Sequence, residues 1–356
     1  FIASGVSAND IAVLFRAHYI SRAIEEAFQR AELPYTLSSG VPFFERAEIK
    51  DSISYLRMIA YKDDLSFLRI ANKPKRNIGE RRISYLKEFA EKHNCTLYKA
   101  LQLCVDDELF SNTKAKDFIA LVEEYAALYK NMSITEIFGL LMNKSGYEKA
   151  LRTLGDQERL DNLAELKQSM YEYETSCGEE CSLENYLIHA SLFAGEDEGN
   201  TKKAVRLMTV HKAKGLEFPI VFIAGLNENI FPSKKIDSIE AMEEERRLAF
   251  VAFTRAEKYL FLTDAEEYTK EATYRHPSRF IFDVDSTLLH YETEISEDSK
   301  QEAISYIEYK NSALTKMSTL SSLSEGDRVK HAILGSGVVL AIDREKKQYT
   351  IQFASI

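Results

Sequence analysis

Short runs of apolar residues constrain the fold of this chain more than any other feature. IAVLF (11–15) comes near the start, and IVFIAGL (220–226) and YLFLT (259–263) come much later. Unbroken runs of this length are typical of strands buried on both faces, which occur in parallel sheets covered by helices. The chain is therefore predicted to contain an α/β domain whose strands come from two distant parts of the sequence.

The segment after the first run supports a parallel arrangement. Apolar residues recur at helical spacing from Ile24 to Ala31, and Ser21 stands where the N-cap of such a helix is expected. Residues 35–38 then read as a second strand. A strand, a helix and a second strand in this order form a βαβ unit, which requires parallel strands.

Between the two groups of strands the chain reads as helices only, until the strand pattern returns with VRLMTV (205–210), which indicates an inserted helical domain. A polar, serine-bearing segment follows the last predicted buried strand, and three short alternating strands separated by glycine and charged turns follow that segment. The predicted organisation is an α/β domain, first part, 1–72; a helical insertion, 73–200; the second part of the α/β domain, 201–285; a linker or loose tail, 286–323; and a small β module, 324–356.

Composition limits the class of protein. The chain has 46 basic and 56 acidic residues, a net charge of −10, which excludes a surface coated in positive charge but permits a local nucleic-acid groove. No apolar run is long enough to span a bilayer. The four cysteines in 356 residues favour a reducing, cytoplasmic setting, and their spacing predicts ordinary thiols and no metal site.

The connection TVHKAKGLEFPIVF (209–222) joins two predicted buried strands and is the first candidate site. Ligands bind α/β folds at the carboxyl ends of parallel strands. His211 and Lys212 suit phosphates, Gly215 permits close backbone approach, and Glu217 suits a ribose hydroxyl. The alternative is a solvated basic turn in which Glu217 pairs with a neighbouring lysine, and composition alone favours that alternative.

Arg255 is the second candidate, because it stands between an apolar helix and an apolar strand in EEERRLAFVAFTRAEKYLFLT (243–263). A buried guanidinium needs an anion. That anion is either a core carboxylate or a nucleotide phosphate, and the pattern does not choose between them. Arg246 and Arg247 are expected to pair locally with Glu243 or Glu244.

Several long motifs in the right order resemble one family. TVHKAKGLEFPIVF and EEERRLAFVAFTRA closely resemble motifs V and VI of the UvrD/PcrA/Rep family of superfamily 1 DNA helicases, and IAVLFR (11–16) resembles motif IVa. GVPFFERAEIKDSISYLRM (40–58) and NKPKRNIGERRI (72–83) match the blocks that follow. The resemblance covers nearly the whole chain.

The resemblance implies two RecA-like (P-loop NTPase-type) domains with ATP in the cleft between them. Residues 1–72 and 201–285 then correspond to the second motor domain, 2A, and 73–200 to the inserted domain 2B. No phosphate-loop motif or acidic Walker B strand occurs here, so Mg²⁺ ligands are expected in motor domains 1A and 1B, outside this chain. The expected protein is an ATP-dependent DNA helicase of 3′-to-5′ polarity in DNA repair or replication, and the fragment alone is expected to be inactive.

The resemblance also implies roles for single residues. Arg255 corresponds to the arginine finger on the γ-phosphate of ATP, and Glu217 to the residue that holds the ribose. Gly215 belongs to the same nucleotide-binding motif.

A second set is expected to contact single-stranded DNA. Arg16 and His211 correspond to backbone contacts in the family, and we add Lys212 beside His211. The family has Thr-Asn where this chain has Ala17-His18, so the contact expected at His18 departs from the family pattern.

A cluster of basic residues marks the entry to the helical insertion. The turn that approaches duplex DNA in the family corresponds here to Lys73, Lys75, Arg76, Asn77 and Gly79. A solvated helix start is the alternative.

The β module resembles the Tudor-like tail of the family, which implies contact with RNA polymerase; a β tail that packs only on itself is the alternative. Two other functions remain open: a non-catalytic nucleic-acid-binding scaffold, and a helicase–nuclease subunit of the AddA or RecB type. A tail of this kind at 324–356 argues against the second, because it occupies the place where a nuclease domain would follow.

Overall fold

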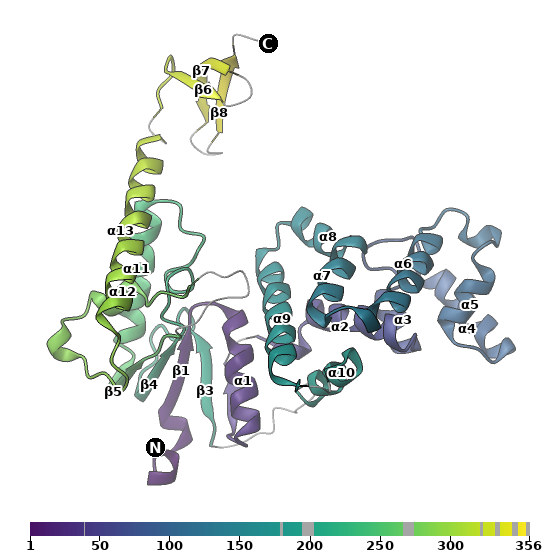
Figure 1. Ribbon diagram of the computed structural model, residues 1–356, viewed down its shortest axis with the longest axis horizontal. Helices are drawn as coiled ribbons and strands as arrows, with labels where there is room; N and C mark the ends of the chain where they lie inside the picture. The colour runs from purple at the N-terminus through teal and green to yellow at the C-terminus, as the bar shows by residue number, and fades with distance from the viewer. Residues whose placement is uncertain are drawn as a thin grey trace. The chain divides into compact units, whose positions relative to one another are not determined.

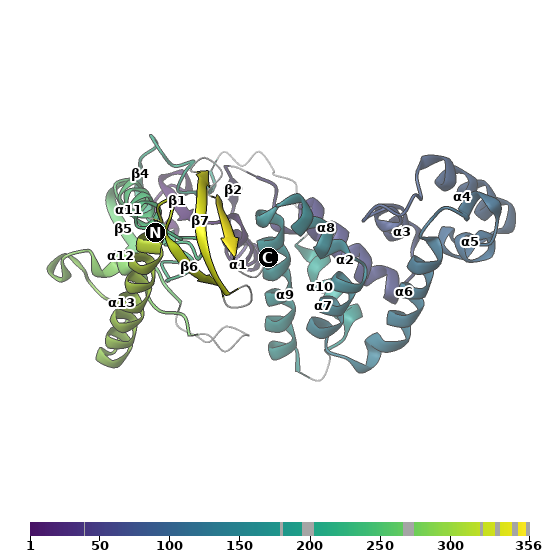
Figure 2. The same ribbon diagram turned by 90° about the horizontal axis from the view of Figure 1, so that it is seen from above.

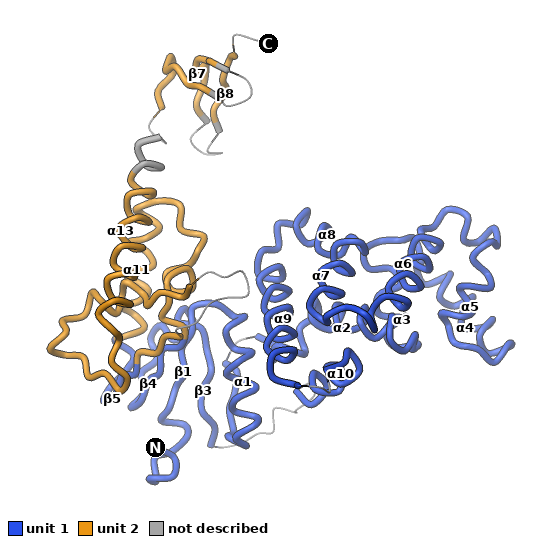
Figure 3. The backbone as a smooth tube through the Cα atoms, viewed as in Figure 1, with its two compact units in different colours: residues 1–224, 254–261, 268–273 blue, residues 225–253, 262–267, 274–356 orange. Residues whose placement is uncertain are grey.

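The computed structural model contains two compact units, each described below by itself (Figures 1 and 3). Unit 1 comprises residues 1–224, 254–261 and 268–273, and unit 2 comprises 225–253, 262–267 and 274–356. The structure describes residues 1–38, 40–178, 181–193, 203–265, 274–320, 323–331, 335–343 and 348–353.

A five-stranded sheet with the order β2-β3-β1-β4-β5 forms the α/β part of the chain. Its strands are β1 (Ile11–Phe15), β2 (Tyr35–Leu37), β3 (Val205–Thr209), β4 (Phe218–Ala224) and β5 (Ala256–Leu262). β1 lies in the middle, is buried throughout, and runs parallel to both β3 and β4. β2 runs parallel to β3. The predicted α/β class and the five predicted strands are confirmed.

Helix α1 (Ser21–Arg30) covers one face of this sheet (Figure 1). Its Ile24 and Phe28 pack on buried strand residues such as Val13 and Leu207, as helical spacing predicts. The predicted N-cap role of Ser21 is wrong. Ser21 is already the first helical residue, and its hydroxyl donates to the carbonyl of His18, three residues earlier, at 2.9 Å.

The helical part of unit 1 extends away from α1, with α9 at the near end and α4 and α5 at the far end (Figures 1 and 2). Its helices are α2 (Ala47–Ala60), α3 (Asp64–Ile70), α4 (Glu80–His93), α5 (Leu97–Cys104), α6 (Ala115–Leu128), α7 (Ile134–Lys144), α8 (Tyr147–Leu154), α9 (Gln157–Ser176) and α10 (Leu183–Leu192). One core of buried apolar side chains extends from Phe43 to Ala190. Because α2 and α3 share this core, the helical body begins before the boundary predicted at residue 73.

Short 3-10 helices complete the described helical structure. They are η1 (Ile2–Ser4), η2 (Ala8–Asp10), η3 (His18–Ile20), η4 (Phe43–Glu45), η5 (Glu108–Phe110), η6 (Tyr129–Asn131) and η8 (Ser286–Leu288).

Unit 2 contains helices α11 (Ile239–Phe253), α12 (Arg279–Phe282) and α13 (Glu297–Leu320). The last of these corrects the prediction of a loose tail over 286–323. The polar composition of α13 reflects a mostly solvated helix, and a few inward residues attach it: Ala303 and Leu314 are buried, and Asn311 accepts a hydrogen bond from Arg279. The local ion pairs predicted for α11 are confirmed: Arg246 pairs with Glu243, and Arg247 pairs with Glu244.

Three antiparallel strands form a separate small sheet in the order β6-β7-β8. They are β6 (Arg328–His331), β7 (Gly335–Asp343) and β8 (Gln348–Phe353), as the alternating pattern predicts. A side chain at Gly337 would begin 2.8 Å from atoms of both Ile351 and Phe353, so only glycine fits where these strands approach. In the part of the chain that the structure describes, no helix combines the length and apolar character needed to cross a membrane.

Candidate functional site

The first group of candidate residues meets where β4 and β5 begin. Arg255 directly precedes β5, and its Nη1 donates to the carbonyl of Leu216 at 3.0 Å, while Nη2 donates to the hydroxyl of Thr254 at 3.1 Å. Leu216 lies between Gly215 and Glu217, both of which are exposed. The fold therefore brings Gly215, Glu217 and Arg255 together from segments distant in sequence.

The backbone keeps this group in register. The amide of Phe218 donates to the carbonyl of Arg255 at 2.9 Å, which joins the first residue of β4 to the residue before β5. Gly215 has a φ of 85°, so its backbone conformation favours glycine, whereas the space around it is open: a Cβ atom there would have nothing within 4 Å beyond its chain neighbours. Arg255 is half-buried, and its two contacts above are to neutral oxygens.

The connection between β3 and β4 separates the candidate residues into two groups, contrary to our expectation of one ligand edge. β3 ends at Thr209 opposite Phe15, the last residue of β1, and β4 begins at Phe218, before the pair formed by Ile220 and Ile11. Residues 210–217 thus run from the carboxyl edge of the sheet back to its amino edge. Gly215 and Glu217 lie at the amino edge, because β4 is parallel to β1.

The second group lies at the carboxyl edge. The amide of Val210 donates to the carbonyl of Phe15 at 3.0 Å, which brings His211 and Lys212 close to Arg16 and His18. Burial lowers the pKa of His18, and the charges of His211 and Lys212 act in the same direction. The four candidate DNA-contacting residues of the α/β part are therefore neighbours.

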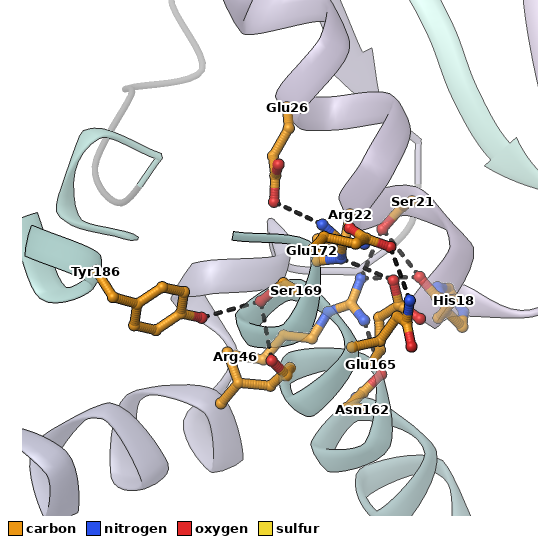
Figure 4. A network of polar contacts seen from close by, with 12 residues as sticks. His18, Ser21, Arg22, Glu26, Arg46, Asn162, Glu165, Ser169, Glu172 and Tyr186 are labelled. Atoms are coloured by element: carbon orange, nitrogen blue, oxygen red, sulfur yellow. Dashed lines mark hydrogen bonds and ion pairs between the residues drawn. The ribbon is translucent and has the colours of Figure 1, made fainter. Parts of the chain in front are cut away.

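A buried polar network holds the backbone beneath this second group (Figure 4). Nη2 of Arg46 donates to the carbonyl of His18 at 3.1 Å and to the hydroxyl of Ser21 at 2.8 Å, and Nη1 donates to Asn162 of α9 at 2.9 Å. Arg46 was not among the predicted site residues. A basic residue before a predicted helix is too common a pattern to reveal this positioning role.

Arg22 continues the network between α1 and α9. Its guanidinium contacts Glu26 at 2.9 Å, Glu165 at 2.7 Å and Glu172 at 2.8 Å. The Arg22 side chain is only 3% exposed, and Glu26 and Glu165 are 8% and 16% exposed. Each of the three guanidinium nitrogens of Arg22 thus donates to a carboxylate of the protein.

The third group is the basic turn at residues 73–79. Lys75 and Asn77 are exposed, and Gly79 is the N-cap residue of α4. The ammonium of Lys73 lies 3.0 Å from both carboxylate oxygens of Asp51, a buried residue of α2 that the sequence patterns did not single out. Lys73 therefore has a protein partner as well as an exposed position.

Arg76 corrects the expectation of a DNA-facing side chain. It is 5% exposed, and its guanidinium donates to the carbonyls of Ile70 and Lys73, both at 2.9 Å, and to the hydroxyl of Tyr55 at 2.6 Å. It also lies over the ring of Phe118, 4.8 Å from the centroid. We assign Arg76 a structural role in the turn and leave it out of the proposed contacts with DNA.

Comparison with known proteins identifies the family of this arrangement. The family model described as the UvrD-like helicase C-terminal domain matches residues 3–267. The chain belongs to this family.

Members of known activity are similar over nearly the whole chain. This chain is 36% identical over 362 residues to the ATP-dependent DNA helicase PcrA of Staphylococcus epidermidis (strain ATCC 12228). The alignment covers 96% of this chain and 49% of that protein. This chain is 34% identical over 359 residues to PcrA of Staphylococcus aureus (strain Mu50), with the same coverage. The chain therefore spans about half the length of the curated relatives it matches and corresponds to their carboxyl-terminal half.

Proposed function

We propose that this chain is the second motor domain, helical insertion and tail of an ATP-dependent DNA helicase that moves 3′ to 5′ on single-stranded DNA in DNA repair or replication. The observation that carries the proposal is the meeting of Gly215, Glu217 and Arg255 at one edge of the sheet in a chain of the UvrD-like family. The RecA-like character of the α/β domain and the Tudor-like character of the β module belong to the same proposal.

The first group fits a nucleotide. Arg255 provides a guanidinium for the γ-phosphate, Gly215 permits close backbone approach, and the exposed carboxylate of Glu217 suits a ribose hydroxyl. A phosphate would give the guanidinium of Arg255 charge-assisted hydrogen bonds, which are stronger than its bonds to the neutral oxygens of Leu216 and Thr254.

The Mg²⁺ ligands are proposed to lie outside this chain, because the resemblance places the phosphate loop and the acidic Walker B strand in domains 1A and 1B. Within the described ranges no cluster of three or more His, Cys, Asp or Glu side chains is arranged to hold a metal ion. When bound, Mg²⁺ would neutralise phosphate charge, while Arg255 stabilises the charge that develops during γ-phosphoryl transfer.

The decisive experiment replaces Arg255 with lysine or alanine in the full-length protein and measures DNA-dependent ATPase activity. We expect kcat to fall by about three decades or more, as for other arginine fingers, with little change in DNA binding. Arg247→Ala is the matched control, because Arg247 is 68% exposed and pairs only locally with Glu244. A kcat of the Arg255 variants equal to that of the control would refute the proposal.

The second and third groups are proposed to contact DNA. Arg16, His18, His211 and Lys212 would hold the backbone of single-stranded DNA, where contacts to phosphate position the strand without reading its sequence. Lys75, Asn77 and Gly79 would approach duplex DNA. Lys73 would also approach duplex DNA, from its position beside Asp51.

The β module is proposed to bind RNA polymerase. The resemblance of residues 324–356 to the family tail supports this, and the three-stranded sheet is compatible with it. A pull-down of RNA polymerase by the full-length protein should succeed, and removal of 324–356 should abolish it; equal recovery without the module would refute the contact.

A further inference from the structure

A groove of about 640 Å³ opens beside the basic turn in the helical part of unit 1. Three segments from different parts of the sequence line it. They are the turn at 74–76, residues 114–124 in and just before α6, and residues 144–153 at the end of α7 and in α8. Only the first of these segments supplied predicted site residues.

Each segment contributes lysine to the groove. The lining includes Lys75 from the turn, Lys114 before α6, and Lys144 and Lys149 from the junction of α7 and α8. All four are exposed, and within the described residues none of their ammonium groups forms an ion pair or hydrogen bond. By contrast, the neighbouring Lys73 is paired with Asp51.

Two carboxylates, Asp117 and Glu124, also line the groove. The four lysines outnumber these two acidic residues, so the net formal charge of the six side chains is positive. This excess stands out in a chain whose net charge is −10. A local concentration of unpaired ammonium groups attracts a polyanion even on an acidic protein.

Arg76 builds the groove from beneath. Its backbone carbonyl accepts the amide of Lys114 at 3.0 Å, its guanidinium lies over Phe118, and it reaches the carbonyl of Ser145 at 3.4 Å. One buried residue therefore contacts all three lysine-bearing segments. The lysines are held on a preorganised frame, which reduces the entropy lost when a ligand binds.

We propose that this groove binds consecutive phosphates of one strand of duplex DNA, through Lys75, Lys114, Lys144 and Lys149. The inference rests on the proposed function and extends the duplex contact from the turn at 73–79 to α6 and α8. Lysine acts as a point charge on phosphate and carries no base pattern, so this contact is independent of sequence.

The test uses the full-length protein and a blunt DNA duplex of arbitrary sequence, with affinity measured over a series of salt concentrations. Two variants separate the claims: Lys75→Glu tests the turn, and Lys144→Glu/Lys149→Glu tests the extension. The matched control is Lys87→Glu/Lys99→Glu, which makes the same charge change at exposed positions of α4 and α5 outside the groove.

We expect the Lys144/Lys149 variant to bind duplex more weakly than the control. The slope of the logarithm of its binding constant against the logarithm of the salt concentration should become shallower by about 2. Each phosphate contact contributes about 0.9 to that slope, and the variant loses two lysines. Binding to single-stranded DNA should not change.

The outcomes are distinguishable. If Lys75→Glu weakens duplex binding and the Lys144/Lys149 variant matches the control, the extended groove is refuted and the proposed duplex contact of the turn stands. If both variants match the control, the groove and that duplex contact both fail, whereas the ATPase test of Arg255 still decides the motor function.

Discussion

For a single arginine, the environment decides its role. Arg76 and Arg255 were both predicted ligand contacts, but the side chain of Arg76 is buried, whereas that of Arg255 is half-buried. Arg76 is enclosed by carbonyls and aromatic rings, and its two Nη groups donate to backbone carbonyls and to the hydroxyl of Tyr55. A buried guanidinium with this many partners is a structural element and not a ligand contact.

Replacing Arg76 should therefore affect stability more than replacing its neighbour. Arg76→Ala removes the hydrogen bonds that the carbonyls of Ile70 and Lys73 accept from a charged donor, and bonds to charged groups contribute about 1.5–3 kcal/mol each. Lys75→Ala, at an exposed position, should change the free energy of unfolding by less than about 0.5 kcal/mol. Urea unfolding followed by circular dichroism measures both, and equal stabilities would contradict the role of Arg76.

If the proposed contact of His18 with DNA is made, the binding should depend on pH. Burial lowers its pKa from the ordinary value of 6.5, Glu158 opposes the shift, and Arg46, His211 and Lys212 reinforce it. The imidazole is thus neutral near pH 7 in the free protein. A nearby DNA phosphate would raise this pKa, so that binding takes up a proton and strengthens as pH falls through the range between the two pKa values.

The measurement is the affinity of the full-length protein for single-stranded DNA between about pH 8 and about pH 5.5. His18→Asn should reduce the pH dependence, and whatever remains reports on other groups such as His211. An identical pH profile in the variant would show that His18 does not sense the phosphate.

Among the elements, the joint between α1 and α9 is electrostatic. Arg22 of α1 lies between Glu26 on its own helix and Glu165 and Glu172 on α9 (Figure 4). Buried ions need several partners to offset their lost hydration, and here one cation meets three carboxylates. The network connects the sheet-covering helix to the helical body.

Arg22→Ala should be strongly destabilising. It removes the buried cation that Glu26 and Glu165 contact, although Arg30 still contacts Glu26 at 3.0 Å, and breaking a buried pair costs about 3–5 kcal/mol. Glu172 is 48% exposed, so Glu172→Gln should cost less than about 1 kcal/mol. A double-mutant cycle of Arg22→Ala with Glu165→Gln, read by urea unfolding, should give a coupling above about 0.5 kcal/mol. Additive effects would contradict the joint.

Taken as a whole, the chain holds one side of a proposed two-sided ATP site. Arg255, Gly215 and Glu217 suit the γ-phosphate and the ribose, and the phosphate loop and Mg²⁺ ligands are proposed to belong to domains 1A and 1B. Residues 1–356 should therefore show no DNA-dependent ATP hydrolysis by themselves. Phosphate release assays with and without single-stranded DNA measure this, and activity above background that is lost in Arg255→Ala would overturn it.

Local patterns in the amino-acid sequence were sufficient to predict the main elements and the family. Strand patterns predicted β1, β3, β4 and β5 closely, because residues buried on both faces of a sheet must be apolar whatever surrounds them. The motifs around residues 209–222 and 243–256 predicted the family correctly, because each is long and they occur in order.

Which charged residues a ligand can reach was settled by the folded chain alone. Folding buried Arg76, placed Glu217 at the opposite edge of the sheet from His211, and brought Lys114 and Lys149 to one groove with Lys75. Burial and proximity depend on contacts between segments distant in sequence. A local pattern reports the identity and spacing of residues, whereas the partners that neutralise or expose a charge come from elsewhere in the fold.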